Sequence, residues 1–401
     1  MFGVNTLQLT VLSRLLLPSV WAQDQWVNSS SAFKHPGVLL SQSQLDFVAD
    51  RIAAADQPWT LAYADMTGET LAALSRKPNP VAVVECGPFS TPDIGCAPER
   101  SDAAAAYLNA LRWVIEGKQE HANKAIEYMD AWSGNLTGHL NVNAGLQAAW
   151  SASVWTRAAE IIRYTNAGWS NAGISRFESL MRDIYLPQVS QSTDKGMNWE
   201  LVLIEATIHI GVFLNDGAVF SNGLDRLTTW APAFVYLQSD GALPKPPPFM
   251  ANTTSVNQTQ LFAYWGGQTT FQADGITTET CQEMKRVGYG ITAISHALET
   301  AYIQDVDLWS GSDLGGRLQA ASDFNIEQAD AASTPTWLCE GKGVDTTDIG
   351  GSTEIVLNAM HNRLSVQMWK TESHTNRNRP MGANYLNLAW ETLTHAGWPA
   401  A

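Results

Sequence analysis

Apolar residues recur along most of this chain at intervals of three and four, which is the spacing of one face of an α-helix. The clearest runs lie at 107–115 and 146–162, and the first is followed by Gly117, a residue type common just past a helix C-terminus. Further runs with this period lie around 43–54, 121–132, 175–186, 199–214, 287–303, 353–366 and 383–396. Strand-like alternation is scarce, so the pattern predicts an all-α protein.

The segments between these runs carry Gly, Pro, Asn and Ser, and none of them reads as a linker between two domains. Many helices in series predict helical hairpins, arranged either as an α-solenoid or as a closed (α/α) toroid. No exact repeat supports a solenoid, so we expect the toroid, or an incomplete barrel of the same kind. The long segment 242–260 holds four prolines and is either functional or disordered, and it is a candidate border of a cleft.

The N-terminus has the pattern of a secretory signal peptide. Arg14 precedes an apolar run, and Val20-Trp21-Ala22 offers a small-residue cleavage site after about Ala22. The alternative is a short buried helix. No later segment approaches the ~20 apolar residues of a membrane span. We therefore expect residues 1–22 to be removed and residues 23–401 to be a single secreted domain, monomeric and with no membrane partner.

Two residue types agree with export. Asparagines in an N-x-Ser/Thr pattern are candidate glycosylation sites, namely Asn28, Asn135, Asn252 and Asn257. The four cysteines form an even set. Cys86 and Cys96 bracket a short Pro/Gly-rich loop that a disulfide would close, and Cys281 and Cys339 remain as a long-range pair; the alternative is free buried thiols. Since no CxxC pattern occurs, we expect no zinc site, and no cofactor.

The charge balance narrows the class of partner. The formal net charge is −15, which argues against nucleic acid and acidic membranes. An acidic protein can still bind an anion where its few cations converge. The chain also has 16 tryptophans, which suit stacking against sugar rings but equally suit a large core.

One concentration of cations stands out in ETCQEMKRVGYG, residues 279–290. Lys285, Arg286 and Tyr289 would share one helix face. Three further segments carry both apolar residues at helical spacing and polar side chains that could do chemistry. They are 139–165, 195–217, and 353–364 together with the late stretch 383–397.

These segments together resemble the alginate-lyase-domain family of polysaccharide lyases. The resemblance rests on LQAAWSASVWTRAAEIIRYT, on NWELVLIEATIHIGVFLND, on the ETC…YG…SHALETA segment, and on NRL with the terminal WETLTHAG. The resemblance covers most of the chain that follows the predicted signal peptide. It implies an (α/α) toroid with an open cleft, and β-elimination of a 4-linked polyuronate such as alginate or glucuronan.

The chemistry of elimination explains which residues are wanted. A cation or amide held against the sugar carboxylate stabilises the enolate-like intermediate, a base removes the neighbouring proton, and an acid protonates the leaving oxygen. The resemblance assigns carboxylate neutralisation to Asn198 and Arg286, and acid, base or both to Tyr289, with His361 as a further candidate base. Side chains expected to bind the anionic polysaccharide are Asn143, Gln147, Trp199, Tyr264, Trp265 and Arg363.

The chain departs from the family pattern in two segments, and in the C-terminal one it has Leu357-Asn358-Ala359 in place of a Tyr-Asn-His run. The pattern E-x-x-R-D-x-x-H-x-x-Y/M-G is met here with Gln282 for the Arg, Glu283 for the Asp and Arg286 for the His. An arginine cannot replace a histidine as a base, because it stays protonated. This departure leaves two alternatives. The protein is a lyase in which other residues take over these roles, or it is a relative with changed or lost activity.

Alternatives remain for these residues and for the function. Arg286 could pair with Glu279 or Glu283 on a solvated face, and Asn198 could be only a helix N-cap. A glycoside hydrolase on the same toroid would need two carboxylates across a cleft. A non-catalytic glycan-binding protein is the third hypothesis.

Overall fold

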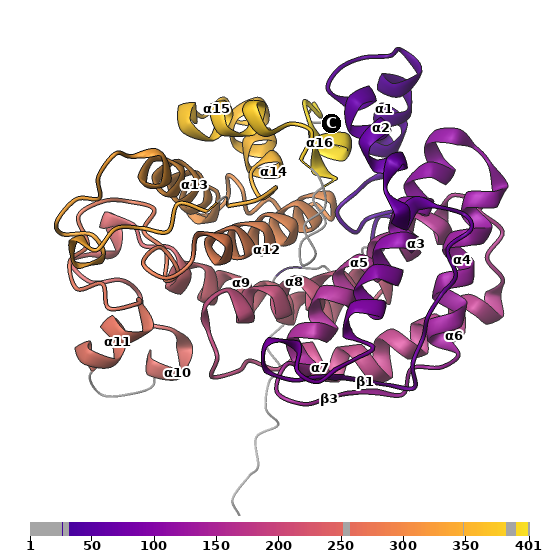
Figure 1. Cartoon of the computed structure of the whole chain (residues 1–401), viewed down its shortest axis with the longest axis horizontal. Coiled ribbons are helices and arrows are strands. Elements are labelled where there is room, and N and C mark those ends of the chain that lie inside the picture. Colours follow the sequence, from indigo (N-terminus) through magenta and orange to yellow (C-terminus); the bar gives the residue numbers. More distant parts are fainter. Residues whose placement is uncertain (1–25, 27–31, 252–256, 348, 382–389, 400–401) are drawn as a thin grey trace, which may run out of the picture.

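The computed structural model describes residue 26 and residues 32–251, 257–347, 349–381 and 390–399 (Figure 1). The proposed signal peptide and the asparagines at 28 and 252 lie outside these residues. So does the first half of the predicted helix at 383–396, residues 383–389. No helix in the described ranges is long and apolar enough to cross a membrane.

The described chain is mostly helical, as the sequence predicts. Its N-terminal helices are α1 (Gln42–Ala53), α2 (Trp59–Gly68), α3 (Cys96–Glu116), α4 (Gln119–Ser133), α5 (Ala144–Tyr164), α6 (Asn171–Ser179), α7 (Leu186–Val189) and α8 (Met197–Phe213). They are followed by α9 (Gly217–Phe234), α10 (Pro248–Ala251), α11 (Gln258–Tyr264), α12 (Met284–Ile303), α13 (Leu314–Asp330), α14 (Glu354–Val356), α15 (Trp369–Asn378) and α16 (Glu391–His395).

Local signals set several helix ends. The Ser41 hydroxyl accepts from the Gln44 N–H at the start of α1, and the Asp216 carboxylate accepts from the Val219 N–H at the start of α9. Gly117 ends α3 in the left-handed conformation, with φ of 65°, as its position after the apolar run predicts.

The helices form an (α/α) toroid. α3, α5, α8 and α12 follow one another through the middle of the molecule, each packed against the next, while α4 packs on α3 and α9 packs on α8 (Figure 1). These packed faces are lined by residues under 5% exposed, such as Trp155 and Ile208. The order of the chain around the ring explains how segments 90 residues apart can meet at one site.

The first and last helices lie together and close the ring. α16 packs against α1 and α2 (Figure 1). The Gln44 side-chain amide donates to the carbonyl of Thr394 at 2.8 Å, and His395 Nε2 lies 3.3 Å from the carbonyl oxygen of Leu39. All of these side chains are buried.

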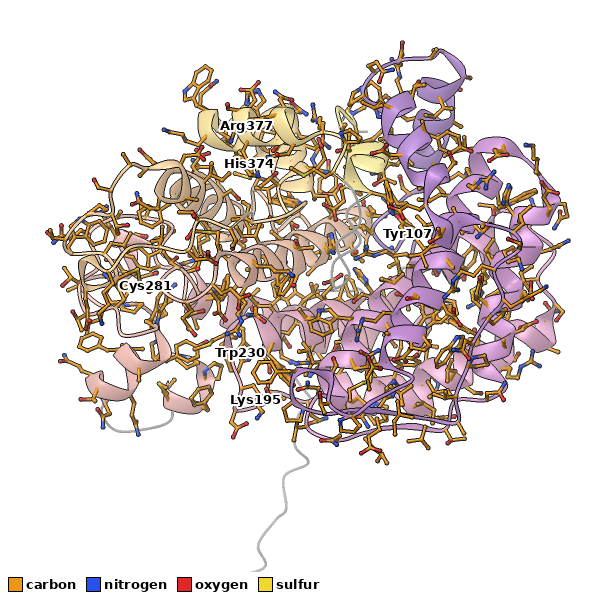
Figure 2. All side chains as sticks on the ribbon, viewed as in Figure 1. Tyr107, Lys195, Trp230, Cys281, His374 and Arg377 are labelled. Carbon is orange, nitrogen blue, oxygen red and sulfur yellow. A yellow bond between two sulfur atoms is a disulfide. The ribbon has the colours of Figure 1, made fainter. Side chains whose placement is uncertain are left out.

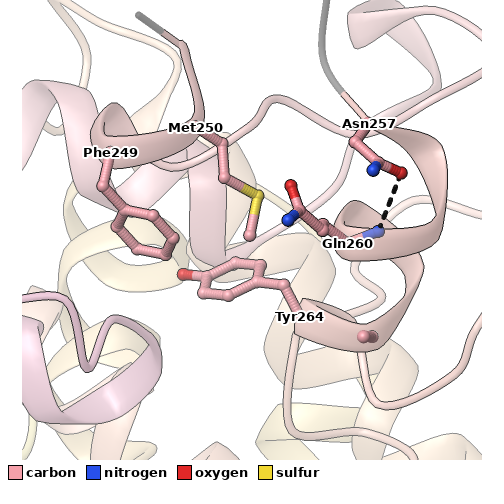
Figure 3. A pocket seen from close by; sticks show the side chains of 6 residues that line it. Phe249, Met250, Asn257, Gln260 and Tyr264 are labelled. Carbon is pink, nitrogen blue, oxygen red and sulfur yellow. Dashed lines mark hydrogen bonds between the residues drawn. The ribbon is translucent and has the colours of Figure 1, made fainter. Parts of the chain in front are cut away.

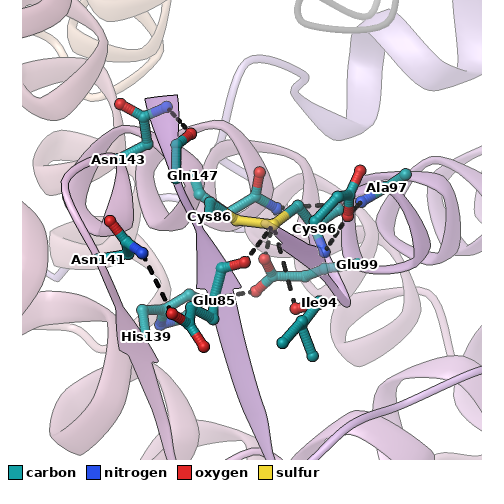
Figure 4. The surroundings of a disulfide bond; sticks show 12 residues. Glu85, Cys86, Ile94, Cys96, Ala97, Glu99, His139, Asn141, Asn143 and Gln147 are labelled. Carbon is teal, nitrogen blue, oxygen red and sulfur yellow. Dashed lines mark hydrogen bonds and ion pairs between the residues drawn. A yellow bond between two sulfur atoms is a disulfide. The ribbon is translucent and has the colours of Figure 1, made fainter. Parts of the chain in front are cut away.

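A small sheet, not predicted from the sequence, lies beside α3 and α5. Its strands β1 (Val83–Cys86), β2 (Asp93–Ile94) and β3 (Gly138–Leu140) are ordered β2-β1-β3, with β2 antiparallel and β3 parallel to β1. The Cys86–Cys96 disulfide joins the end of β1 to the start of α3, which confirms the predicted pairing (Figure 4).

Candidate active site

The N-termini of α8 and α12 carry the polar residues that the sequence singles out. α8 packs between α5 and α12, so the first turns of both helices lie on one side of the ring. Gly196 precedes α8 with φ of 63°, and a Cβ there would come 2.7 Å from the Tyr264 ring. The Tyr264 hydroxyl accepts from the Met197 N–H at 3.1 Å, so the start of α8 is fixed against α11.

Asn198 and Glu279 are joined directly. The Asn198 Nδ2 donates to Glu279 Oε1 at 2.7 Å, across 81 positions of sequence. The Glu279 side chain is almost fully buried, and its Oε2 has no hydrogen-bond partner among the described residues. Burial raises the pKa of Glu279 to about 7; Glu283 adds to this rise, while Arg286 and Asn198 oppose it. This carboxyl therefore exchanges its proton near neutral pH.

Arg286 lies in the first turn of α12, three residues before Tyr289. Its Nε lies 2.9 Å from Glu283 Oε2, and the two side chains are 45% and 43% exposed. The ion pair foreseen as the alternative for this residue is therefore present. The same guanidinium also lowers the pKa of Glu279 and of Tyr289, in each case against the larger effect of burial.

Tyr289 lies one turn further along α12 and is 7% exposed. Its ring meets Trp150 of α5 edge-on, with centroids 6.4 Å apart. Burial raises the pKa of Tyr289 to about 12, with Glu283 acting in the same direction and Arg286 in the opposite one. The phenol is therefore protonated at neutral pH, which suits a proton donor.

A pocket of about 460 Å³ adjoins the start of α8. It is lined by Phe249, Met250, Asn257, Gln260, Ala263 and Tyr264 (Figure 3). Tyr264 lies edge-on to Phe249, with centroids 6.0 Å apart, and its hydroxyl reaches the residue before Asn198. The predicted cleft border at 242–260 is thus a hollow next to the site, so far as this segment is described.

Trp199, which the sequence predicts to bind sugar, follows Asn198 in the first turn of α8. It is partly buried against the main core, and the Lys195 ammonium lies 5.8 Å from its ring centroid. Figure 2 shows Lys195 at the lower edge of the molecule, with Cys281 among the loops near α13. Gln282, which stands where the family pattern has an arginine, is exposed, and its amide donates to the carbonyl of Thr278 at 3.0 Å.

The structure corrects the sugar-binding role predicted for Gln147. This side chain is 1% exposed, and its Nε2 donates to the carbonyl of Cys96 and to Glu99, while Arg100 donates to its Oε1. Asn143 is half-buried, and its Nδ2 donates to the carbonyl of Gly87 at 2.7 Å (Figure 4). Both amides support the disulfide-closed loop, because their hydrogen bonds end on its backbone.

Trp265 and Arg363 also have structural roles instead of the predicted contacts with sugar. Trp265 is fully buried in a small aromatic cluster with Phe271. Arg363 forms a two-point ion pair with Glu299, at 2.9 and 2.6 Å, and both side chains are at most 4% exposed. Neither group can meet a polysaccharide without local unfolding.

His361 lies apart from the Asn198 group. Its Nδ1 is 3.0 Å from the carbonyl oxygen of Val366, and it lines a different pocket, of about 180 Å³, with Trp59 and Arg379. Its predicted role as a further base for the elimination therefore has no support from the geometry.

The second disulfide, Cys281–Cys339, is present as predicted and anchors the turn that carries Glu279. Asn135 and Asn257 are both exposed, as glycan acceptors must be.

Glu279 itself was considered from the sequence only as an ion-pair partner or as a hydrolase carboxylate. The only feature of the sequence that points to Glu279 is its position at the start of the cation-rich segment, four residues before Glu283. That position does not show that the side chain is buried.

Comparison with known proteins gives a family match over part of the chain and a shared fold. Residues 93–246 match the family described as alginate lyase. No curated protein matches the sequence. Alginate lyase A1-III from Sphingomonas species A1 superposes with a TM-score of 0.61 at 15% identity, covering 91% of this chain and 97% of that one.

Two further solved structures agree with this result. A variant of alginate lyase A1-III complexed with a tetrasaccharide gives a TM-score of 0.60 at 16% identity, over 91% of this chain and 96% of the other. An alginate lyase from Bacteroides ovatus gives 0.53 at 11% identity, over 90% and 99%. At these identities the likeness establishes the shared toroid fold.

Proposed function

From the match of residues 93–246 to the alginate lyase family and from the shared fold, we propose that this chain belongs to that family and is a polysaccharide lyase that cleaves a 4-linked polyuronate by β-elimination. The observation that carries this proposal is the hydrogen bond that joins the Asn198 amide, at the start of α8, to Glu279, just before the helix α12 that carries Arg286 and Tyr289. Asn198 reaches Glu279, and Arg286 acts on both Glu279 and Tyr289.

The first task of such a site is to hold the sugar carboxylate. The proton to be removed is only weakly acidic while that carboxylate keeps its full charge, so a partner for the charge stabilises the enolate-like intermediate. Arg286 has a half-exposed guanidinium and Asn198 a half-buried amide, and these are the groups that we assign to it.

Tyr289 is the group that we assign to proton transfer. Its phenol donates a proton to the glycosidic oxygen as the carbon–oxygen bond breaks. The tyrosine oxygen in turn takes the proton from the carbon that bears the carboxylate, and the electrons of that carbon–hydrogen bond form the new carbon–carbon double bond. The phenol is regenerated, and no further acid or base is needed. Arg286 stabilises the transient negative charge on the phenol oxygen, in line with its effect on the pKa of Tyr289.

The hydrolase alternative is less well supported by the available carboxylates. Glu205 pairs with Arg157 at 2.7 Å and Glu299 pairs with Arg363, and all four side chains are buried. Glu279 and Glu283 remain. Both belong to the single turn that leads into α12, so they do not face each other across a cleft as a hydrolase requires.

The setting of the enzyme is part of the proposal. We propose a secreted, glycosylated monomer acting on an external anionic polysaccharide, because the N-terminal pattern, the exposed Asn135 and Asn257, and the two disulfides are all consistent with export. That variants of alginate lyase A1-III are found with a tetrasaccharide supports an oligosaccharide-sized binding site.

The test is to supply polymannuronate, polyguluronate, glucuronan and a neutral glucan, and to follow ultraviolet absorbance, since elimination creates a conjugated double bond and hydrolysis does not. Tyr289→Phe should abolish the signal while polyuronate binding persists. Tyr302→Phe, on the same helix, is the matched control and should keep wild-type turnover. Wild-type turnover by Tyr289→Phe would refute the mechanism. Binding without any product would favour the glycan-binding alternative, and sugar release without absorbance the hydrolase.

A further inference from the structure

The hydrogen bond between Asn198 and Glu279 leaves the carboxyl group under-solvated. An ionised carboxylate has about four lone-pair sites, and burial without partners for them is costly. Here the side chain is 1% exposed, Oε1 accepts from the Asn198 Nδ2 at 2.7 Å, and Oε2 has no partner among the described residues. A proton on this carboxyl group would remove most of that cost.

The protonation state of Glu279 also dictates which end of the Asn198 amide it can hold. A carboxylate only accepts hydrogen bonds, so the amide must turn its NH₂ group inward and leave its carbonyl oxygen facing outward. A carboxylic acid can donate instead, and its O–H pairs with the amide oxygen. The amide then turns over about its last side-chain bond, with nitrogen and oxygen exchanging places.

We propose that Glu279 is a positioning residue whose proton decides which face Asn198 presents to the sugar. When Glu279 is protonated, both N–H donors of Asn198 face the substrate carboxylate. When Glu279 is ionised, the outward carbonyl oxygen of Asn198 repels that carboxylate. This inference rests on the proposed function, because it assigns the uronate as the ligand of Asn198.

The charges around Glu279 act in the same sense. The groups that face it are Asn198 from α8, Tyr264 from α11, and Glu283 and Arg286 at the start of α12. With Glu279 ionised, two carboxylates oppose one guanidinium, and the site repels an anion. With Glu279 protonated, Glu283 and Arg286 balance. Binding of a uronate is therefore linked to uptake of one proton, and the pKa of about 7 means that both forms are populated near neutrality.

The first test is the pH dependence of kcat/KM on whichever polyuronate the enzyme cleaves. Wild-type kcat/KM should fall about tenfold for each pH unit above about 7, because only the protonated free enzyme binds productively. Glu279→Gln should flatten this profile, since a glutamine amide donates to the Asn198 oxygen at every pH. Tyr289, with a pKa of about 12, does not titrate in this range. A Glu279→Gln variant that keeps the wild-type slope would overturn the proposal.

A second measurement needs no substrate. The side-chain ¹⁵N–H₂ signals of Asn198, identified by their loss in Asn198→Asp, should shift with a midpoint near 7 in the wild type and stay constant in Glu279→Gln. Such a titration without turnover on any polyuronate would leave the switch standing and reject the lyase. Turnover without this titration would keep the lyase and reject the switch. If both are absent, both proposals fail.

Discussion

Replacing Glu279 by glutamine should make the folded protein less sensitive to alkaline pH. The pKa of this carboxyl group is raised from an ordinary value of 4.5 to about 7, mainly because the side chain is buried. A carboxyl group with a raised pKa binds its proton more tightly in the folded than in the unfolded state. The free energy of unfolding therefore falls as pH rises from about 4.5 to about 7, and the full cost is present above that range.

The size of this effect follows from the shift. A rise of about two and a half pH units corresponds to about 3 kcal/mol, at 1.36 kcal/mol per unit. Because the side chain is 1% exposed, solvent screening reduces this figure little. Glutamine has nearly the same shape and keeps a hydrogen bond to Asn198, so it should avoid the charge-burial cost without leaving a cavity.

The assay is urea unfolding of both proteins at about pH 5 and about pH 8.5. The free energy of unfolding of Glu279→Gln minus that of the wild type should rise by about 2.5 kcal/mol between the two pH values, because a small part of the change has already occurred at about pH 5. Other titrating groups are common to both proteins and cancel in this difference. Glu327→Gln is the control, because that side chain is 56% exposed and its profile should run parallel to the wild type. A parallel profile for Glu279→Gln would show that the buried carboxyl does not titrate as argued.

Three further outcomes are expected. Arg363→Ala should lower the free energy of unfolding by about 3–5 kcal/mol, because it leaves Glu299 buried without its cation; a loss below about 1 kcal/mol in urea unfolding would contradict this. Replacing Cys281 and Cys339 together by serine should cost about 4 kcal/mol for a crosslink spanning 58 residues, and should slow elimination because the turn carrying Glu279 loses its anchor; an unchanged rate would argue against that anchoring role. Peptide mapping of protein secreted from a eukaryotic host should find a glycan on Asn135, and an unmodified peptide would count against it.

The helices were predictable where apolar residues recur at helical spacing, even though α5 and α12 are buried on almost all sides. The apolar period at 146–162 corresponds to α5, and that at 287–303 to α12. α9 and α13 were not predicted. α13 has few strongly apolar residues, and its Arg317 is buried through hydrogen bonds with Asp240 that no local pattern reports. The small sheet was not predicted, because its strands are at most four residues long and so show no clear alternation of apolar and polar residues.

The candidate site was predictable only as a set of residue types. Asn198, Arg286 and Tyr289 carry the right chemistry, and the structure brings them to one group through Glu279 and Glu283. The errors share a cause. Whether an amide or a guanidinium is free to bind sugar depends on buried partners supplied by distant segments, and neither Glu99 beside Gln147 nor Glu299 beside Arg363 leaves a trace in the local sequence.

The meeting of α1 and α16 has a consequence for the order of events during synthesis. Neighbouring hairpins such as α3 with α4 and α8 with α9 can pair as soon as they emerge, since their partners are close in sequence. The contacts of Leu39 and Gln44 cannot form until residues 394 and 395 have left the ribosome. Until then the part of α1 that α16 covers must stay exposed or be covered by a temporary partner, although α2 and α3 can already pack against the rest of α1. The last step of folding closes a loop of about 350 residues, which is slow compared with pairing of local hairpins.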